Sequence, residues 1–576
     1  MTKPDDLFFE MYWVLCPWGR RMPLQSIWYD ITRQYTRRLV GIRSVSPGKG
    51  ELLVAEEVLG LLRAGGLESA YTESGLDPLT GDPFSRQNAY AFLRGRSPRT
   101  IVMLGHIDTV DTADYGPLEP WATDPAGLAA RQDALVELAP DLAEDLASYP
   151  GDWMFGRGVI DMKSGVAATI AVVRRLAQMA REGNLPLSVV LLATPDEENE
   201  SAGILQAVHF LLLLREQYGL QYLGAINTDY TTARYPGDQH RYIYTSTIGK
   251  LLPSFLVIGR EAHVGDPFAG VDANLLAAEL IRDLSMNDEL CDVVRGQITP
   301  PPVTLHATDL KTHYDVQLPF MAYFYLNVLT FSTGPGELLA RLRQRAQEVL
   351  EHTLRRIDAA ERRWVRTSGD PVRQERLEPC SGIVVTYAGL YAEVGQQLGE
   401  KAVDAELARA WKSFPGKLDA RERCLHLVRR LWTLSGKQGP ALVIYYAPPY
   451  YPHVAATPCL LHDVVTEVAL AHSGLHLEVR EYYSFISDMS YLRLDPGIDL
   501  AALTANIPTW QEPGTPARPG SYTLPLAAIQ ELDLPVVNLG PYGAGVHQLG
   551  ERALISYSFG ILPQLLYEVI ERLGKP

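Results

Sequence analysis

Short apolar runs recur along the chain and predict the strands of a buried sheet. Four of them have the length and the β-branched content of strands that are covered on both faces. These runs are 100–104, 188–194, 222–227 and 535–540. Between them, apolar residues recur at helical spacing, as in 51–66 and 162–183. Because strands alternate with helices, the pattern predicts an α/β fold whose largely parallel sheet has helices on both faces.

The middle of the chain has a different pattern. The segments 250–259 and 323–331 are strand-like and rich in β-branched and aromatic residues, and 275–284 between them has helical spacing. Further helical patterns follow, and the buried-strand pattern resumes only later in the chain. The prediction is an α/β domain interrupted by a smaller α+β unit, with the segments 1–246, 247–455 and 456–576.

Composition and charge narrow the class of protein. At 576 residues, with 47% apolar and 21% charged residues, the chain can bury a large core and exceeds one ordinary domain. A net charge of −16 argues against a nucleic-acid-binding surface. The five cysteines are scattered without a CxxC pair, so neither a disulfide framework nor a cysteine zinc site is indicated.

The chain also lacks the usual signals for secretion or membrane insertion. Its N-terminus has no basic start followed by a small-residue cleavage site. No apolar run approaches the ~20 residues that span a bilayer. We therefore expect a soluble, cytoplasmic protein with neither nucleic-acid nor membrane partners.

An acidic stretch follows one of the predicted strands. The sequence TPDEENESAG, 194–203, carries carboxylates at Asp196, Glu197, Glu198 and Glu200. Like charges at such spacing raise one another's pKa. An isolated stretch of this kind is most often a solvated loop, so its meaning depends on which other groups reach the same place.

Residues of types that can bind metals also follow three other predicted strands, and one more precedes a predicted helix. In chain order these are His106 and Asp108 in GHIDTV, Asp161 in GRGVIDMKSG, Asp229 in NTDY and His547 in GVHQLGE. Each alone has an ordinary explanation, because a lone His-x-Asp is usually a satisfied pair and an Asp before a helix is usually an N-cap. However, ligands of open α/β sheets bind at the carboxyl ends of the strands. Two imidazoles and three carboxylates at one crevice suit a pair of divalent metal ions, with one carboxylate between them.

These segments resemble, in order and approximate spacing, the five signature segments of the co-catalytic zinc hydrolase family. That family includes aminoacylase, glutamate carboxypeptidase and succinyl-diaminopimelate desuccinylase. The resemblance covers nearly the whole chain and implies a zinc-peptidase α/β catalytic domain with an inserted lid domain. Within the family, the size of the chain, the DMKSG variant and SFISDMSYL (484–492) resemble its arginine-utilization branch.

The resemblance also implies a role for each site residue. The implied metal ligands are His106 and Asp229 on one ion, Glu198 and His547 on the other, and Asp161 bridging both. Glu197 would be the general base, and Asp108 would orient His106, as carboxylates behind metal ligands do. The two ions would be zinc, although cobalt and manganese tolerate the same ligands.

The predicted lid carries a further motif of the family. The segment GREAHVGDPFAGVDAN (259–274) resembles the lid motif in which a histidine, here His263, steadies the developing oxyanion, often in the partner subunit's site. Asn274 matches a lid asparagine that contacts substrate. The alternative for His263 is an ordinary loop histidine. The resemblance also implies a homodimer formed through the lid.

Two features depart from the family. Many members carry an arginine in a later lid strand that grips a substrate carboxylate, but here Asn327 and Leu329 lie near that place. The lid is also enlarged, and a further insertion over 120–153 precedes Asp161. We expect this insertion at the rim of the catalytic domain.

Taken with the resemblance, the sequence predicts a dinuclear metallohydrolase that cleaves an amide-type C–N bond of a small molecule. Candidate substrates are N-acyl or N-carbamoyl amino acids and short peptides, and the link to arginine catabolism rests on resemblance alone. The alternative is a non-catalytic descendant that binds a ligand or a partner. The presence of Glu197 beside every expected ligand favours the enzyme, because a binding module needs no general base.

Overall fold

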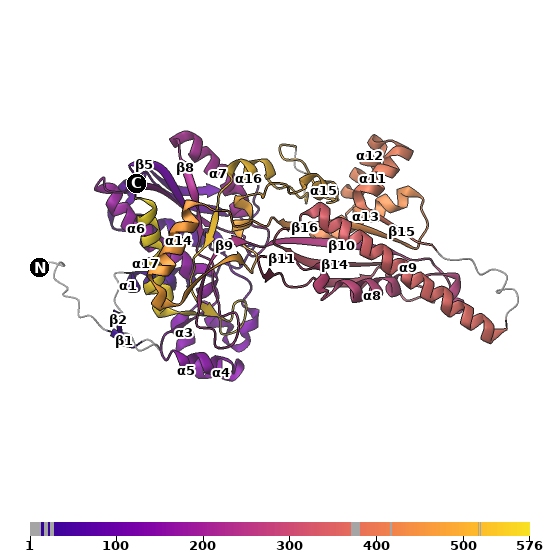
Figure 1. Ribbon diagram of the computed structural model, residues 1–576, viewed down its shortest axis with the longest axis horizontal. Coiled ribbons are helices and arrows are strands. Elements are labelled where there is room, and N and C mark those ends of the chain that lie inside the picture. The colour runs from indigo at the N-terminus through magenta and orange to yellow at the C-terminus, as the bar shows by residue number, and fades with distance from the viewer. Residues whose placement is uncertain are drawn as a thin grey trace, which may run out of the picture. The chain divides into compact units, whose positions relative to one another are not determined.

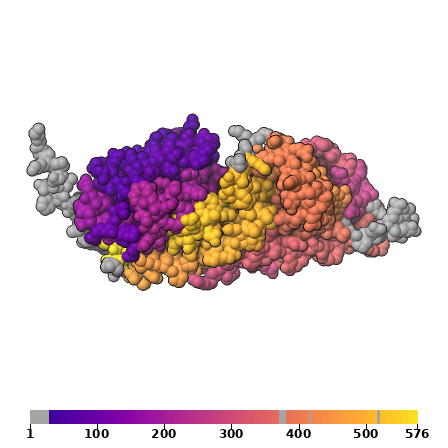
Figure 2. Space-filling view, turned by 90° about the horizontal axis from the view of Figure 1, so that it is seen from above, coloured from indigo at the N-terminus to yellow at the C-terminus, as the bar shows by residue number. Residues whose placement is uncertain are grey.

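The computed structural model describes residues 13–15, 21–23, 28–369, 381–414, 418–515, 518 and 520–575 (Figure 1). Contacts between residues divide the chain into two units. The first comprises Met1–Thr247, Val454–Leu494 and Leu526–Pro576, and the second comprises Ile248–His453 and Asp495–Pro525. The first unit thus joins segments from both ends of the chain, and Figure 2 shows yellow C-terminal residues beside purple and magenta residues of the first half.

An eight-stranded sheet forms the centre of the first unit, in the order β17-β9-β18-β8-β5-β7-β4-β3. Its central strands are the four that the sequence predicted, and they run parallel to one another. They are β5 (Ser97–His106), β7 (Leu187–Thr194), β8 (Gln221–Asn227) and β18 (Val536–Asn538). The outer strands are β3 (Glu73–Pro78), β4 (Gln87–Leu93), β9 (Arg241–Thr247) and β17 (Leu477–Tyr483). The predicted α/β class is therefore confirmed.

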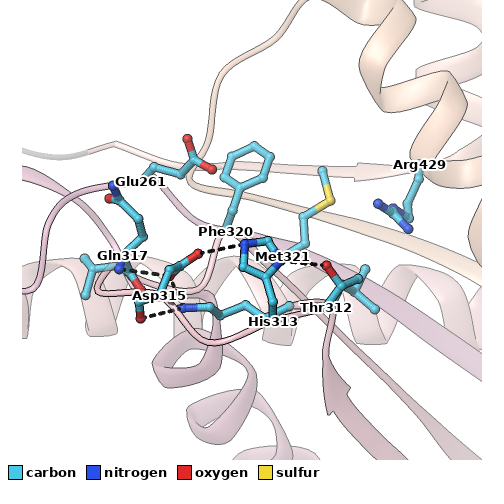
Figure 3. A pocket seen from close by; sticks show the side chains of 11 residues that line it. Glu261, Thr312, His313, Asp315, Gln317, Phe320, Met321 and Arg429 are labelled. Carbon is cyan, nitrogen blue, oxygen red and sulfur yellow. Dashed lines mark hydrogen bonds and ion pairs between the residues drawn. The ribbon is translucent and has the colours of Figure 1, made fainter.

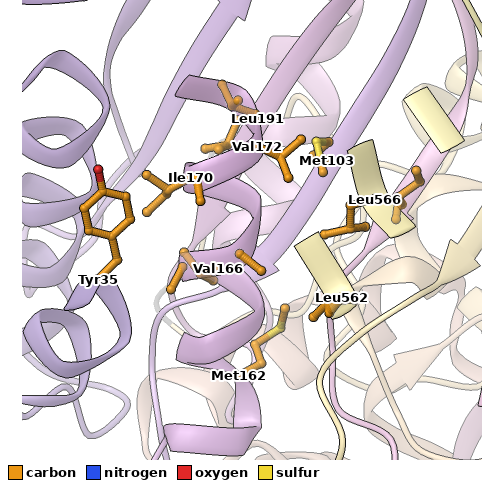
Figure 4. Close-up of a cluster of buried hydrophobic side chains, with 14 of the residues drawn as sticks. Tyr35, Met103, Met162, Val166, Ile170, Val172, Leu191, Leu562 and Leu566 are labelled. Carbon is orange, nitrogen blue, oxygen red and sulfur yellow. The ribbon is translucent and has the colours of Figure 1, made fainter. Parts of the chain in front are cut away.

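Helices with apolar faces cover this sheet. Every residue of β7 is buried, as expected for a strand that is packed on both faces. Figure 4 shows Val166 and Ile170 of α6 (Ser164–Arg181) in one hydrophobic cluster with Leu191 of β7 and Leu562 of α17 (Leu562–Leu573). The other helices are α1 (Tyr29–Val40), α2 (Gly50–Arg63), α7 (Ala202–Tyr218), α14 (Leu460–Ala471) and α16 (Leu526–Leu532).

A smaller sheet and a group of short helices complete the first unit. The three-stranded sheet consists of β19 (Gly543–Ala544), β20 (Arg552–Leu554) and β6 (Trp153–Phe155), in that order. Before β6 lie α3 (Pro125–Ala129), α4 (Gln132–Leu138) and α5 (Leu142–Ser148). A short hairpin, β1 (Trp13–Leu15) and β2 (Arg21–Pro23), lies near the N-terminus.

The second unit contains a five-stranded sheet in the order β13-β14-β10-β16-β15. Its strands are β10 (Gly249–Ile258), β13 (Val303–Asp309), β14 (Met321–Thr330), β15 (Ile383–Thr386) and β16 (Ala441–Tyr451). Its helices are α8 (Ala273–Leu284), α9 (Pro335–Ser368), α11 (Tyr387–Leu398), α12 (Glu400–Lys412), α13 (Ala420–Ser435) and α15 (Leu500–Ala505), and β11 (Val293–Val294) and β12 (Gln297–Ile298) form a hairpin. A pocket of about 220 Å³ in this unit is lined by Phe320, Met321 and Arg429, among others (Figure 3).

One boundary differs from the sequence prediction. The prediction assigned all of 456–576 to the catalytic domain, but Asp495–Pro525 groups with the second unit. Asn506 contributes to the attachment, because its side chain accepts a hydrogen bond from the Ala388 amide at 3.0 Å and its carbonyl accepts one from the Tyr446 amide at 2.8 Å. Single polar anchors of this kind leave no periodic signal in the sequence.

Two further findings bear on the composition. Of the five cysteines, Cys16 and Cys380 lie outside the described residues, and Cys291, Cys424 and Cys459 are free. In the part of the chain that the structure describes, no helix combines the length and the apolar character needed to cross a bilayer.

Candidate metal centre

The carboxyl ends of the parallel strands bring the predicted site residues to one end of the first unit's sheet. His106 is the last residue of β5 and pairs in register with Thr194, the last residue of β7. On its other side, β5 pairs with β8 so that Leu104 lies opposite Asn227. The loop of the glutamate pair and the segment of Asp229 therefore begin at the level of His106.

Asp161 lies between two imidazoles. Its Oδ1 is 2.9 Å from Nε2 of His106, and its Oδ2 is 3.1 Å from Nε2 of His547. Nε2 of His547 is also 2.9 Å from Oε1 of Glu198. The potential ligand atoms of His106, Asp161 and Glu198 all lie within 4.8 Å of one another, which is close enough for shared metal binding.

Asp229 is buried beside this group and is fixed through its backbone. The side chain of Asn538 at the end of β18 accepts a hydrogen bond from the Asp229 amide at 3.1 Å and donates one to the Asp229 carbonyl at 2.9 Å. A Cβ atom at Gly540 would collide with that carbonyl, so this close approach requires glycine. Burial, together with the charge of Asp161, raises the pKa of Asp229 well above its usual value.

Glu197 faces the same group without lying between its members. Its Oε2 is 4.0 Å from Nε2 of His106. Burial raises the pKa of Glu197 well above its usual value, and the charges of Glu198 and Asp488 act in the same direction. Burial and the charge of Asp161 also raise the pKa of Glu198. The cluster therefore has more negative charge than its surroundings stabilise.

The two imidazoles partly offset this charge. Burial alone would lower the pKa of His547, but hydrogen bonds to Asp161 and Glu198 raise it to about 10. Burial opposes the protonation of His106 as well, yet its bonds to Asp108 and Asp161 raise its pKa. These contacts in turn hold the pKa of Asp161 well below its usual range against the effect of burial. A bound metal ion would replace these protons, since histidine coordinates as the neutral imidazole.

The four carboxylates of the acidic stretch have different surroundings. Asp196 is buried, forms an ion pair with Arg86 and accepts a hydrogen bond from the Ala202 amide at 3.1 Å. Glu197 and Glu198 face the imidazoles, whereas Glu200 is exposed.

Two site residues have an unusual backbone conformation. Asp196 has a φ of 76° and His547 has a φ of 59°, values that are uncommon for residues other than glycine. Sparsely populated backbone conformations of this kind are concentrated at functional sites.

Asp108 makes contacts that the sequence did not predict. Its Oδ1 lies 3.5 Å from Nδ1 of His106, the neighbour it was expected to orient. Its carboxylate also accepts hydrogen bonds from the backbone amides of Glu197, at 3.2 Å, and Glu198, at 3.0 Å. Asp108 therefore holds the loop that carries the glutamate pair.

Asp488, in the SFISDMSYL segment, lies beside this group, although the sequence analysis assigned it no role. Its Oδ2 accepts a hydrogen bond from the Thr194 hydroxyl at 3.0 Å, while its buried Oδ1 has no partner among the described residues. Burial raises the pKa of Asp488 to about 7. The distinctive motif around it was the available signal, but one motif could not reveal that Asp488 contacts the end of β7.

The two predicted lid residues lie in the second unit. His263 is exposed, and its Nδ1 accepts a hydrogen bond from the Gly265 amide at 3.0 Å. The Asn274 side chain donates to Oδ2 of Asp309 at 3.2 Å. Their proposed contacts with substrate stay predictions.

The donor set of the first unit fits a pair of divalent cations. The imidazole nitrogens of His106 and His547 and the oxygens of Asp161, Glu198 and Asp229 are ligand types that zinc binds. His106, Asp161 and Asp229 are buried, and among the described residues no lysine or arginine forms an ion pair with the carboxylates of Asp161, Glu198 and Asp229. Cations bound at this place would offset the repulsion between these carboxylates.

Two bacterial proteins are similar to this chain over most of its length. The model of "Peptidase family M20/M25/M40" matches residues 102–349. The uncharacterized protein YqjN of Bacillus subtilis is 32% identical over 93% of this chain and 95% of its own length. Protein RocB of the same organism is 33% identical over 85% of each chain. Among solved structures, aminopeptidase PepT from Bacillus cereus has a TM-score of 0.51 at 13% identity, covers 95% of this chain and 99% of its own, and supports the fold.

Proposed function

The chain belongs to peptidase family M20/M25/M40, a family of metal-dependent peptidases and amidohydrolases, and on that premise we propose that it hydrolyses an amide-type C–N bond of a small substrate. The candidate substrates are N-acyl or N-carbamoyl amino acids and short peptides. The observation that carries the proposal is Asp161 between the imidazoles of His106 and His547, with Glu197 facing one of them at 4.0 Å.

In this proposal, five side chains would hold two divalent metal ions. They are His106 and Asp229 for one ion, Glu198 and His547 for the other, and Asp161 for both. Bound there, the ions would polarise the scissile carbonyl and lower the pKa of the attacking water towards ~7. Zinc suits these ligands, and cobalt and manganese are the alternatives.

Glu197 serves as the general base. As a carboxylate it takes a proton from the attacking water and then delivers that proton to the leaving amine. Burial raises the pKa of Glu197, which makes its carboxylate a stronger base for this transfer. Asp108 keeps Glu197 and Glu198 in place through their backbone amides.

We further propose that the chain forms a homodimer through the second unit. β13 is an edge strand of the five-stranded sheet, and Val303 and Leu305 on it are 42% and 54% exposed. An apolar edge strand favours pairing with another strand.

Derivatives of arginine and ornithine are the first substrates to test, because the chain is similar to RocB and carries the arginine-utilization motifs. In this proposal the protein acts in the cytoplasm.

A substrate screen tests the function. The zinc-loaded wild type and its Glu197→Gln variant are incubated with N-acetyl, N-succinyl and N-carbamoyl amino acids and with dipeptides, and the free amine is quantified. We expect the wild type to release amine from at least one class and Glu197→Gln to release almost none. A wild type that binds zinc and its candidate ligands but hydrolyses none of these amides would favour the alternative of a non-catalytic binding protein.

A further inference from the structure

A small sheet links the segments that carry Asp161 and His547. β6 precedes Asp161, and β20 follows His547. The two strands pair antiparallel, with Phe155 opposite Arg552 and Trp153 opposite Leu554. Because these two segments share one hydrogen-bond ladder, a shift of either strand changes the spacing between Asp161 and His547.

A buried arginine beside β6 connects this region to the preceding segment. Nη1 of Arg157 donates to Oε2 of Glu551 at 2.8 Å, and Nη2 donates to both carboxylate oxygens of Asp114 at 2.7 and 2.6 Å. The other oxygen of Glu551 accepts from the backbone amides of Ile160, at 3.3 Å, and Asp161, at 3.5 Å. Asp114 is thus connected to the backbone of Asp161 through the buried side chains of Arg157 and Glu551.

A second arginine makes the matching connection on β20. Nε of Arg552 donates to Oδ2 of Asp145 at 2.8 Å, and Nη1 donates to the carbonyl of Gly550 at 3.0 Å. Gly550 belongs to the turn that follows His547, and Arg552 is only 4% exposed. Asp145 on α5 therefore holds the segment of His547, as Asp114 holds that of Asp161.

Both aspartates come from the same stretch of chain, between β5 and β6. We propose that this stretch, residues 113–152, is a positioning element of the metal centre, in which Asp114 and Asp145 fix the spacing of Asp161 and His547 through Arg157 and Arg552. The sequence had placed most of this stretch at the rim. The inference rests on the metal centre proposed above, because spacing matters only if both side chains share the ions.

The test measures zinc affinity in variants that keep the shape but remove the charge. Zinc is titrated against a chromophoric chelator in the wild type, Asp114→Asn and Asp145→Asn, at a temperature where each metal-free protein is fully folded. We expect a loss of about 10- to 100-fold in each variant, as for other groups that hold metal ligands in place. The control is Asp133→Asn, a change at an exposed residue of α4 in the same stretch, which should bind zinc as the wild type does. Wild-type affinity in both Asp114→Asn and Asp145→Asn would overturn the proposal.

Two further measurements separate positioning from general weakening of the fold. Asp114→Glu keeps the charge and should recover part of the lost affinity, which a purely steric role would not predict. In metal-free protein, amide hydrogen exchange should speed up over 156–163 and 543–552 in the Asn variants while β5 and β7 stay protected. If the wild type binds no zinc, the proposed metal centre fails and the positioning role fails with it. If the wild type binds zinc but exchange over both segments is unchanged in the Asn variants, the positioning role alone is rejected.

Discussion

Buried carboxylates in the two units have opposite surroundings. Asp292 in the second unit is 6% exposed, and one of its oxygens accepts hydrogen bonds from the amides of Phe331, Ser332 and Thr333 at 2.8 to 2.9 Å. These donors and the Thr333 hydroxyl hold its pKa below the usual value, although burial opposes this. Glu197 in the first unit instead has the carboxylates of Glu198 and Asp488 near it, and burial with their charges raises its pKa, although His106 opposes this.

The difference shows how a structural acid can be told from a functional one. A buried carboxylate that accepts several backbone hydrogen bonds is already stabilised in its ionised form. Carboxylates that repel one another without enough donors are stable only if cations join them. The following experiments test whether the carboxylates of the first unit require metal ions and whether Asp292 of the second unit is stable without them.

The largest effect is expected at Asp161. Asp161→Asn removes the charge between the two imidazoles, so the chain should lose at least one of its metal ions. We expect hydrolysis to fall by more than about 10⁴-fold. This exceeds the upper end of what a general base contributes, because the loss of a metal ion should cost more than the loss of the base. Glu200→Gln, an exposed change in the nearby acidic stretch, is the control and should keep both ions. An Asp161→Asn protein with two tightly bound ions would remove the bridging role.

Glu197 should behave differently from its neighbour Glu198. Glu197→Gln is expected to keep the fold and both metal ions but to lose about 10²- to 10⁴-fold in kcat. Glu198→Gln should lose metal as well as activity. Hydrolysis of the best substrate by Glu197→Gln at the wild-type rate would show that the assignment of ligand and base within the pair is wrong.

His263 tests whether the second unit takes part in the reaction. If it donates a hydrogen bond to the developing oxyanion, His263→Ala should lower kcat by about 10²-fold while metal content stays constant. Mixing His263→Ala with Glu197→Gln then reports on the dimer. Activity partly returns if the histidine acts across subunits, because one site of a mixed dimer is intact, and no activity returns if it acts within its own chain. A fully active His263→Ala protein would refute both versions.

The smallest effect is expected at Asp292 and concerns stability. Because its pKa is lowered on folding, Asp292 stabilises the second unit above its unfolded pKa of about 3.9, and this contribution disappears as the pH falls through the folded pKa. Asp292→Asn should therefore cost about 1–3 kcal/mol at pH 7 and flatten the loss of stability below pH ~4. Urea unfolding between pH 7 and 3 measures this. An unchanged acid profile would mean that Asp292 does not carry this dependence.

The sequence predicted the parts of the molecule that depend on periodic patterns. The apolar runs located β5, β7, β8 and β18, and the residues that follow them led to the expectation that His106, Glu198 and Asp229 meet. Contacts between single side chains and distant backbone atoms left no such pattern. The grip of Asp108 on the glutamate amides and the attachment of Asp495–Pro525 through Asn506 are of this kind. They depend on the folded geometry, which no spacing in the sequence encodes.

The central claim is that the crowded carboxylates of the first unit hold two metal ions. The most direct test is the zinc content of the wild-type chain, measured by mass spectrometry after loading with excess zinc and removal of the unbound metal by gel filtration. The account predicts two zinc ions per chain, and the same number in Glu197→Gln. A correctly folded wild type that retains one ion, or none, under the same conditions would contradict it.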